Sequence, residues 1–206
     1  MIQFGKILAI GAHPDDIEFG CMGFLLKQGA GVEKHIYVAS LGSAGDPSTG
    51  PARQQESAQA LASLKPTSIH FRREKGIEAG DFNIVLDQLT SIIGDIQPDL
   101  ILTLGDHDTH QEHRRIYEIT LAAARRSRAS ILAYGILSNT LDFKPALFVD
   151  IGQVIEEKKQ SLRHHLSQKD KYYMTDEYFE IFHSNTYASL HGLRYCEAYE
   201  IVRIFT

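Results

Sequence analysis

Residues 6–20 read KILAIGAHPDDIEFG, an apolar run of the kind found in buried strands, followed by a short polar loop and the start of a helical pattern. The loop places Asp15 directly beside Asp16. Because two adjacent carboxylates repel each other, a loop that keeps them together indicates a cation nearby. The stretch therefore predicts a strand-to-helix unit with a charged site between its two elements.

The alternation of apolar runs and helical patterns continues along the chain. Strands are predicted at residues 6–12, 35–40, 68–71, 99–105 and 131–136. Helices, with apolar residues at three-and-four spacing, are predicted at residues 17–30, 51–64, 81–96 and 113–126. After residue 140 the pattern predicts a strand (146–152), a helix (154–166) and a last strand (199–205). Strand and helix, repeated four times, favour parallel pairing with right-handed crossovers, hence an α/β fold with a Rossmann-like, mostly parallel sheet and helices on both faces.

The composition indicates one globular domain over residues 1–206, since 206 residues of which 43% are apolar suffice for a single core. The net charge of -5 gives no broad basic field, so no nucleic-acid partner is expected. No apolar stretch approaches the ~20 residues of a membrane-spanning helix, so no membrane insertion is expected. Two cysteines, Cys21 and Cys196, are too few for a disulfide framework and favour a reduced, cytoplasmic protein with Cys21 in the core. The oligomeric state stays open, a homo-oligomer included.

Two polar loops are expected to meet in one crevice. In an open parallel sheet the ligand crevice lies beyond the carboxyl ends of the strands, where the strand order reverses. The loop at 13–16 follows the first predicted strand, and the loop GDHDTHQEH at 105–113 follows the fourth. In a 3-2-1-4 strand order these two strands are neighbours, so the two polar clusters converge.

Histidines and carboxylates in these loops have the spacing of metal ligands. His13 and Asp16 are three apart at a loop-to-helix junction, and His110 and His113 are three apart where the next helix starts, so each pair can face one way. Nitrogen and oxygen ligands without thiolates fit zinc or another first-row divalent ion such as Fe²⁺. Three protein ligands leave a position for water, which is typical of a catalytic metal site.

Simpler interpretations stay open for several of these residues. The loop with Pro14 and the two aspartates also fits a plain helix start with an aspartate cap. Thr109 and Glu112 match a capping box, so Glu112 is either a helix cap or a catalytic group. His107 and Asp108 are expected on the loop surface.

Three further features have ordinary structural interpretations. Arg53 and Glu56 lie three apart in a predicted helix and fit an intrahelical ion pair. The tyrosine-rich C-terminal quarter is expected to pack mostly in the core. The glycine-rich stretch at 40–50 fits a mobile rim of the site.

Several motifs, in order along the chain, resemble one enzyme family. The stretch AHPDDIEFGCMG at 12–23 resembles the AHPDDE-type signature of the zinc-dependent N-acetylglucosaminyl deacetylases, the LmbE-like or PIG-L-like family. HQEH at 110–113 is similar to the second motif of that family, H-P-D-H. Weaker similarities are found for Arg53 with Glu56 (R-x-x-E), for residues 165–168 (H-x-S-Q) and for residues 195–199 (A-E-x-F).

The resemblance implies an LmbE-like deacetylase fold and a zinc-dependent hydrolase that removes the N-acetyl group from an N-acetylated amino sugar or its conjugate, of the N-acetylglucosamine type. It implies these roles at matching positions: zinc ligation by His13, Asp16 and His113, base catalysis by Asp15, oxyanion stabilisation or amine protonation by His110, and substrate binding by Arg53. If it is protonated beside the carboxylates, His110 could supply the oxyanion contact and then the proton. Glu112 stands where the family usually has Asp, and Ile17 displaces Glu18 by one position, so no role is implied for Glu18.

Three other functions compete with this one. A metal-dependent amidase of another conjugate fits the same residues. A metal-dependent phosphoesterase needs a second metal, for which Asp106 and Asp108 are the spare carboxylates. A non-catalytic nucleotide-binding module fits the sheet, but the chain has neither the G-x-G-x-x-G pattern nor a P-loop. The sequence does not identify the aglycone that the amino sugar carries.

Overall fold

A sheet of seven strands forms the centre of the computed structural model, which describes residues 4–43, 47–74, 76–184 and 186–205. The strands are β1 (Lys6–Gly11), β2 (Glu33–Val38), β3 (Ser68–Phe71), β4 (Leu100–Thr103), β5 (Ser130–Tyr134), β6 (Leu147–Asp150) and β7 (Cys196–Arg203). Their order across the sheet is β3-β2-β1-β4-β5-β7-β6. The first five strands are parallel, and β7 runs antiparallel to both β5 and β6. The predicted mostly parallel sheet and the 3-2-1-4 order of its first half are confirmed.

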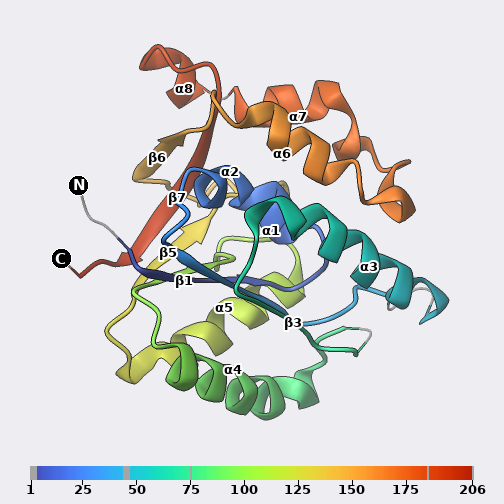
Figure 1. The fold of residues 1–206 in the computed structure, drawn as a ribbon, viewed down its shortest axis with the longest axis vertical. Coiled ribbons are helices and arrows are strands. Elements are labelled where there is room, and N and C mark those ends of the chain that lie inside the picture. The colour runs from blue at the N-terminus through green and yellow to red at the C-terminus, as the bar shows by residue number, and fades with distance from the viewer. Residues whose placement is uncertain (1–3, 44–46, 75, 185, 206) are drawn as a thin grey trace.

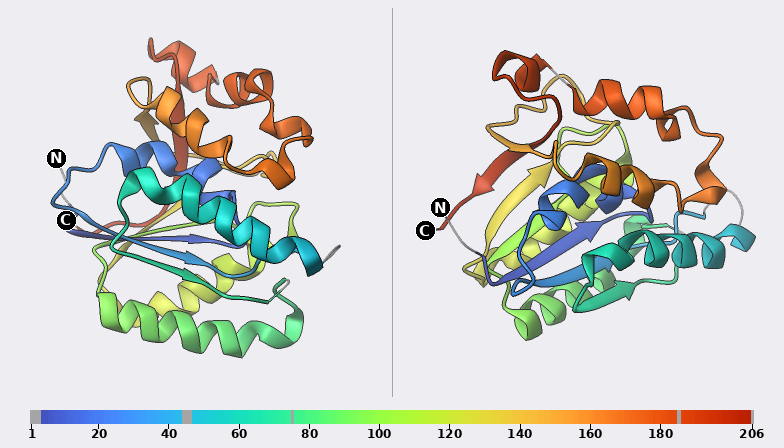
Figure 2. Two further views of the ribbon diagram at one scale, coloured as in Figure 1. Left: turned by 45° about the vertical axis from the view of Figure 1, so that its right-hand side comes forward. Right: turned by 45° about the horizontal axis from the view of Figure 1, so that its top comes forward.

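Helices cover both faces of the sheet, as predicted (Figure 1). On one face lie α4 (Phe82–Ile96) and α5 (Gln111–Ala123), and on the other lie α1 (Asp16–Gly20), α2 (Met22–Leu26), α3 (Gly50–Ala60) and α6 (Ile155–Leu162). Beyond α6, the chain forms α7 (Asp176–His183) and α8 (Thr186–Leu190), which extend the same layer (Figure 2). None of the helices in the described part of the chain has the length and apolar character that a membrane span requires.

The helix predicted at 17–30 is in fact two short helices with a break at Cys21. The backbone of Cys21 is not helical, with φ −139° and ψ 10°. The two oxygens of Glu197 accept hydrogen bonds from the backbone N–H groups of Gly23 and Phe24, each at 2.7 Å, and so cap the second helix. The sequence pattern could not show this break, because the carboxylate that caps the second helix belongs to Glu197 on β7, 174 positions after Gly23.

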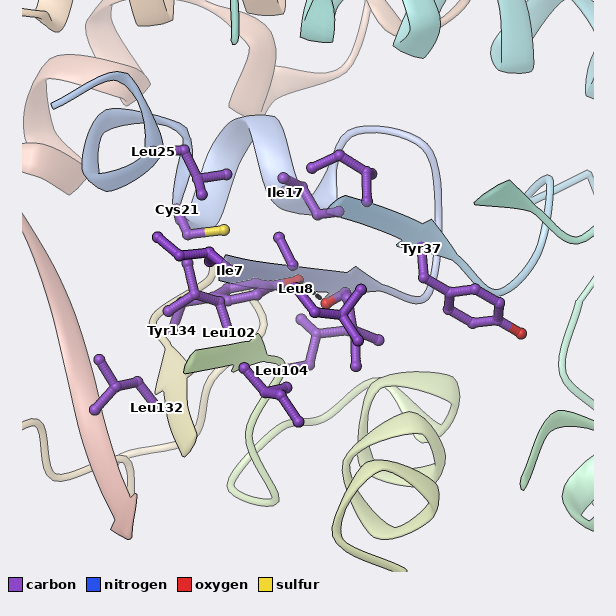
Figure 3. Close-up of a cluster of buried hydrophobic side chains, with 14 of the residues drawn as sticks. Ile7, Leu8, Ile17, Cys21, Leu25, Tyr37, Leu102, Leu104, Leu132 and Tyr134 are labelled. Atoms are coloured by element: carbon purple, nitrogen blue, oxygen red, sulfur yellow. Dashed lines mark hydrogen bonds between the residues drawn. The ribbon is translucent and has the colours of Figure 1, made fainter. Parts of the chain in front are cut away.

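The central strands bury apolar side chains on both faces. Figure 3 shows Ile17, Cys21 and Leu25 packed over one side of the strands, with Leu104 on the opposite side. All four side chains are fully buried, which confirms the prediction that Cys21 belongs to the core. Strands covered on both faces read as continuous apolar runs rather than as alternating ones, and this is why β1, β4 and β5 were recognisable in the sequence.

A buried ion pair joins the C-terminal strand to the first helices. Nζ of Lys158 on α6 lies 2.5 Å from Oε1 of Glu197, and both side chains are almost completely buried. The hydroxyl of Tyr199 also donates to Glu197, at 2.7 Å. Together with the amides of Gly23 and Phe24, four donors satisfy one buried carboxylate. The charge of Lys158 therefore depends on Glu197 for its compensation.

We expect Glu197→Gln to lower the free energy of unfolding by about 3–5 kcal/mol, because it leaves the Lys158 ammonium buried without its counter-charge. The matched control is Arg163→Met, which removes the exposed Arg163–Asp176 pair, with side chains 52% and 67% exposed, and should cost less than about 1 kcal/mol. Urea unfolding followed by circular dichroism measures both. Equal losses in the two variants would contradict the role given to the buried pair.

Candidate active site

The loop between β1 and α1 is organised by the carboxylate of Asp16. Oδ2 of Asp16 accepts hydrogen bonds from the backbone N–H groups of Ala12 and His13, both at 2.8 Å. The preceding residue, Asp15, has φ 115°, a left-handed conformation that costs a non-glycine residue about 1–3 kcal/mol. Asp15 occupies the N-cap position of α1, but its side chain makes no capping hydrogen bond. A plain helix start therefore does not explain why an aspartate stands there.

The loop between β4 and α5 is organised by Asp108. Oδ1 of Asp108 accepts from the backbone N–H of His110 at 2.7 Å, and Oδ2 lies 2.8 Å from Nδ1 of His113. Asp108 is only 2% exposed, so the prediction that it lies on the loop surface is wrong, whereas His107 is exposed as expected. The two donors compensate the carboxylate for its burial, as buried charges require.

Donor atoms from the two loops converge on one point. Nδ1 of His13 lies 3.3 Å from Nε2 of His113 and 3.6 Å from Oδ2 of Asp16. Nε2 of His113 lies 3.5 Å from Oδ1 of Asp16. Ligand atoms about 2.0–2.2 Å from one tetrahedral metal are about 3.3–3.6 Å apart. The two ring nitrogens and a carboxylate oxygen of Asp16 could therefore hold a single first-row ion, and all three residues line the cavity described below.

Hydrogen bonds orient both histidine rings so that one nitrogen of each faces that position. His113 donates through Nδ1 to Asp108, which leaves Nε2 as an acceptor. His13 donates through Nε2 to Oε2 of Glu112 at 2.9 Å. With its pKa raised, His13 also carries a proton on Nδ1 when no metal is bound, and that proton lies between Nδ1 and Nε2 of His113, 3.3 Å apart. A bound cation would take the place of this proton, and a carboxylate behind a histidine is the usual support of a metal-ligating imidazole.

Glu112 does not form the predicted capping box. Its Oε2 accepts from the backbone N–H of Ile77 at 3.1 Å as well as from His13, while Thr109 donates its hydroxyl to the carbonyl of Ser138. The N-cap of α5 is His110, whose Nδ1 accepts from the N–H of Glu112 at 3.3 Å. Glu112 is thus a positioning residue for His13, and its extra methylene relative to Asp lets it span the gap between His13 and the 72–81 loop.

His110 lies beside both other histidines. Its ring stacks on that of His113 with 4.4 Å between centroids and meets that of His13 edge-on at 4.8 Å. One nitrogen atom from each of these three rings lies within 4.8 Å of the other two, so the three histidines are also close enough to share a metal ion. Burial and the two neighbouring histidines hold the pKa of His110 below its ordinary value. The lowered pKa favours the neutral ring, in which Nδ1 accepts from the Glu112 amide and Nε2 is the donor.

The charged groups of the loop are buried together and shift one another's pKa values. Burial raises the pKa of Asp15 to about 6, with Arg53 opposing and Asp16 adding to the shift. Burial alone would raise the pKa of Asp16, but His113 and His13 bring it well below its usual range. Burial lowers the pKa of His13, and Asp16 and Glu112 outweigh it to give about 10. Three buried or half-buried carboxylates thus face two adjacent imidazoles, an arrangement that a divalent cation neutralises.

Arg53 reaches the site from α3. Its Nη2 donates to the carbonyl of Pro14 at 2.9 Å and lies 3.4 Å from Oδ2 of Asp15, and its Nη1 donates to the carbonyl of Gly42. A side chain at Gly42, which has φ +60°, would collide with the guanidinium. Glu56, the expected ion-pair partner of Arg53, instead accepts from the N–H and hydroxyl of Ser167. Arg53 thus connects the loop that contains Pro14 and Asp15 with the loop that contains Gly42.

A cavity of about 480 Å³ opens over these residues. The predicted site residues all line it: His13, Asp15, Asp16, Arg53, His110 and His113. Its outer wall carries Gln168, Tyr172 and Tyr173. The prediction that the C-terminal tyrosines pack mostly in the core holds for Tyr195 and Tyr199, whereas Tyr172 is 67% exposed and Tyr173 is only partly buried. Of the glycine-rich stretch predicted as a rim of the site (residues 40–50), Gly42 lines the cavity. Residues 44–46 of this stretch lie outside the described residues. The convergence is confirmed; the chemical roles of the residues stay predictions.

Sequence reasoning missed two supporting groups besides Asp108. Ser138, in the loop after β5, has its hydroxyl 3.2 Å from Nδ1 of His113. Glu18, for which no role was implied, accepts from Ser57 at 2.6 Å and lies 3.1 Å from Nε2 of His165, so that α1, α3 and the segment after α6 are joined by buried polar contacts. The match of residues 165–168 to the H-x-S-Q motif was the signal available for His165; Ser138 had none.

Comparison with known proteins identifies the family. The profile of the PIG-L family, described as GlcNAc-PI de-N-acetylase, matches residues 8–124. The "Uncharacterized deacetylase YaiS" of Escherichia coli (strain K12) is 33% identical over 158 residues, which cover 70% of this chain and 81% of that protein.

Solved structures share the fold. N,N'-diacetylchitobiose deacetylase from Pyrococcus horikoshii superposes with a TM-score of 0.84 at 23% identity, over 97% of this chain and 84% of that one. The 4-carboxy-2-hydroxymuconate hydratase GalB from Pseudomonas putida KT2440 superposes with a TM-score of 0.77 at 16% identity, over 98% and 97% of the two chains. At these identities the likeness concerns the fold alone. The family profile and the E. coli relative decide the assignment: this chain belongs to the PIG-L family of GlcNAc-PI de-N-acetylases, a family of deacetylases.

Proposed function

We propose that this chain is a metal-dependent hydrolase that removes the N-acetyl group from an N-acetylated amino sugar or its conjugate. One observation carries the proposal: Nδ1 of His13 and Nε2 of His113 lie 3.3 Å apart, each has one oxygen of Asp16 within 3.5–3.6 Å, and Asp15 lines the same cavity. The substrate class is supported by the family description and by the name of the P. horikoshii enzyme.

Zinc is the metal we assign, with Fe²⁺ as the alternative for the same ligands, because both accept nitrogen and oxygen donors in this geometry. When bound, the ion supplies the Lewis acidity that amide hydrolysis needs at neutral pH. Asp108 and Glu112 orient the two imidazoles from behind. Oligomeric state and a cytoplasmic location stay predictions.

Asp15 is the proposed general base. It lies outside the triangle of ligand atoms, Arg53 holds it in place, and its strained backbone presents it next to Asp16. A carboxylate there can accept the proton of the water that attacks the acetyl carbonyl, a contribution of about 10²- to 10⁴-fold. The C–N bond then breaks, acetate and the free amine form, and the proton passes to the amine nitrogen.

His110 is the proposed oxyanion donor. Because its Nδ1 accepts from the Glu112 amide, Nε2 of the neutral ring carries a hydrogen. A fixed N–H donor that faces the developing negative charge lowers the barrier of acyl transfer. Arg53, whose guanidinium already contacts Asp15, completes the same wall and is proposed to meet the substrate there.

A phosphoesterase is disfavoured by the contacts of the spare carboxylates. Both oxygens of Asp108 are engaged by His110 and His113, and Asp106 is exposed. Neither one offers a free ligand for the second metal that two-metal phosphoester hydrolysis uses.

The test is amine release from a panel of N-acetylglucosamine conjugates by metal-stripped protein to which zinc is returned. Full activity at one equivalent of zinc is expected. Amine release that does not depend on metal, or activity that needs two equivalents, would overturn the proposed centre. No release from any conjugate would overturn the substrate class.

Asp15→Asn should retain zinc and lose about 10²- to 10⁴-fold in turnover, because only the base is removed. His13→Ala should instead lose the zinc, because one of three ligands is gone. Zinc content by mass spectrometry and amine release are measured on both. Near-normal turnover of Asp15→Asn would show that another group is the base.

Asp108→Asn should weaken zinc binding about 10- to 100-fold, because it removes the charge that supports His113. The matched control is Asp106→Asn, two positions earlier on the exposed part of the same loop, which should leave the affinity unchanged. Competition with a chelator measures both dissociation constants. An equal effect of the two substitutions would indicate a general charge effect instead of a contact.

A further inference from the structure

A second cavity, of about 490 Å³, adjoins the active-site cavity. Ile136 and Leu137, in the loop after β5, line both cavities and so form their shared wall. The next residue, Ser138, contacts the metal-side histidine His113. We call this second cavity the lateral groove; its apolar walls come from Phe143, Pro145, Phe148, Ile181 and Phe182.

Two of the polar side chains in the lateral groove are fully engaged. Glu197 is held by Lys158, Tyr199 and two backbone amides. Asn139 accepts from the N–H of Ile136 and donates to the carbonyl of His107. His183 contacts the carbonyl of Cys196 through Nδ1, and its ring is enclosed by those of Phe19, Phe179 and Phe182, while its buried Nε2 has no hydrogen-bond partner among the described residues. Tyr178 also lines the groove, so the wall is mostly apolar with few polar atoms left to meet a ligand.

These engagements decide what chemistry the groove accepts. A sugar hydroxyl placed in the lateral groove would lose its hydrogen bonds to water and find few partners, which is costly. An alkyl or aryl group would bury apolar surface against several aromatic rings, which is favourable. The active-site cavity differs, because Arg53, Thr109 and Gln168 line it and offer polar atoms to hydroxyls.

We infer that the lateral groove binds an apolar aglycone carried by the amino sugar, while the sugar itself occupies the active-site cavity. The inference rests on the proposed function. If the group removed is an acetyl, the acyl side of the scissile amide ends in one methyl group at the metal centre. An apolar part that reaches the lateral groove, next to Ile136 and Leu137, must then lie on the other side of the amide, in the conjugate.

The rim residue Ile181 makes the inference testable without disturbing the core. Ile181, on α7, lines the groove and is 64% exposed. Ile84, on α4 at the opposite face of the sheet, is 52% exposed and lines neither cavity. Ile181→Gln and Ile84→Gln are therefore matched substitutions of an exposed helical isoleucine. Phe143→Ala provides a second variant in the groove wall.

The experiment compares kcat/KM for methyl and octyl N-acetylglucosaminides, both anomers, below micelle-forming concentrations. Each methylene that enters the groove is worth about fourfold, so the octyl glycoside should be preferred at least about tenfold even when only part of the chain is buried. Ile181→Gln and Phe143→Ala should each lower the octyl-to-methyl ratio at least about threefold. Ile84→Gln should leave that ratio at the wild-type value.

Other outcomes overturn the inference in distinguishable ways. Turnover of both glycosides at equal efficiency would leave the deacetylase intact and exclude the apolar aglycone. A preference for N-octanoyl over N-acetyl glucosamine that Ile181→Gln abolishes would place the acyl chain in the groove. Dissociation of a dimer by Ile181→Gln, seen by sedimentation without any octyl preference, would show that a second copy covers it. Turnover of neither glycoside would remove the proposed function and the inference together.

Discussion

The hydrogen bonds of the Asp16 carboxylate are the constraint on which the site depends. One buried oxygen fixes the backbone of Ala12 and His13, and the other faces His113 across the gap between β1 and β4. The loop must therefore turn sharply, and Asp15 takes the left-handed conformation as a result. The parallel pairing of β1 with β4 brings the second loop within reach. Sheet topology and one carboxylate together place donor atoms from positions about a hundred residues apart.

A buried cluster of this charge is stable only with full compensation, and each member has a specific partner. Arg53 lies against Asp15, His13 against Glu112, and His113 against Asp108. Pairs of this kind contribute little net stability, because desolvation offsets most of the attraction between charges. Their arrangement orients both imidazole rings and directs one nitrogen of each toward the other, which suits the proposed metal site better than it serves stability.

The elements that could be predicted from the sequence are those that leave a regular local pattern of apolar residues. The strands β1, β4 and β5 carry continuous apolar runs. The expected strand order of a parallel sheet was then enough to predict that His13, Asp16 and His113 lie close together. The prediction that Asp108 is exposed was wrong because the sequence does not show that the His110 amide and His113 donate hydrogen bonds to it. The break at Cys21 and the role of Glu112 failed for the same reason: their partners, Glu197 and Ile77, are distant in sequence.

The family profile matches residues 8–124 only, and the two cavities extend beyond that part of the chain. The family profile ends at residue 124, so it includes the proposed metal ligands, the proposed base and His110. The remaining walls of both cavities come from later segments, around residues 136–148 and 168–198. The same fold carries a deacetylase in one structural neighbour and a hydratase in another, so the fold alone does not set the reaction. On the proposed function, the loops that carry His13, Asp16 and His113 would determine which bond is broken, and the C-terminal segments that line both cavities would determine which molecule can present it.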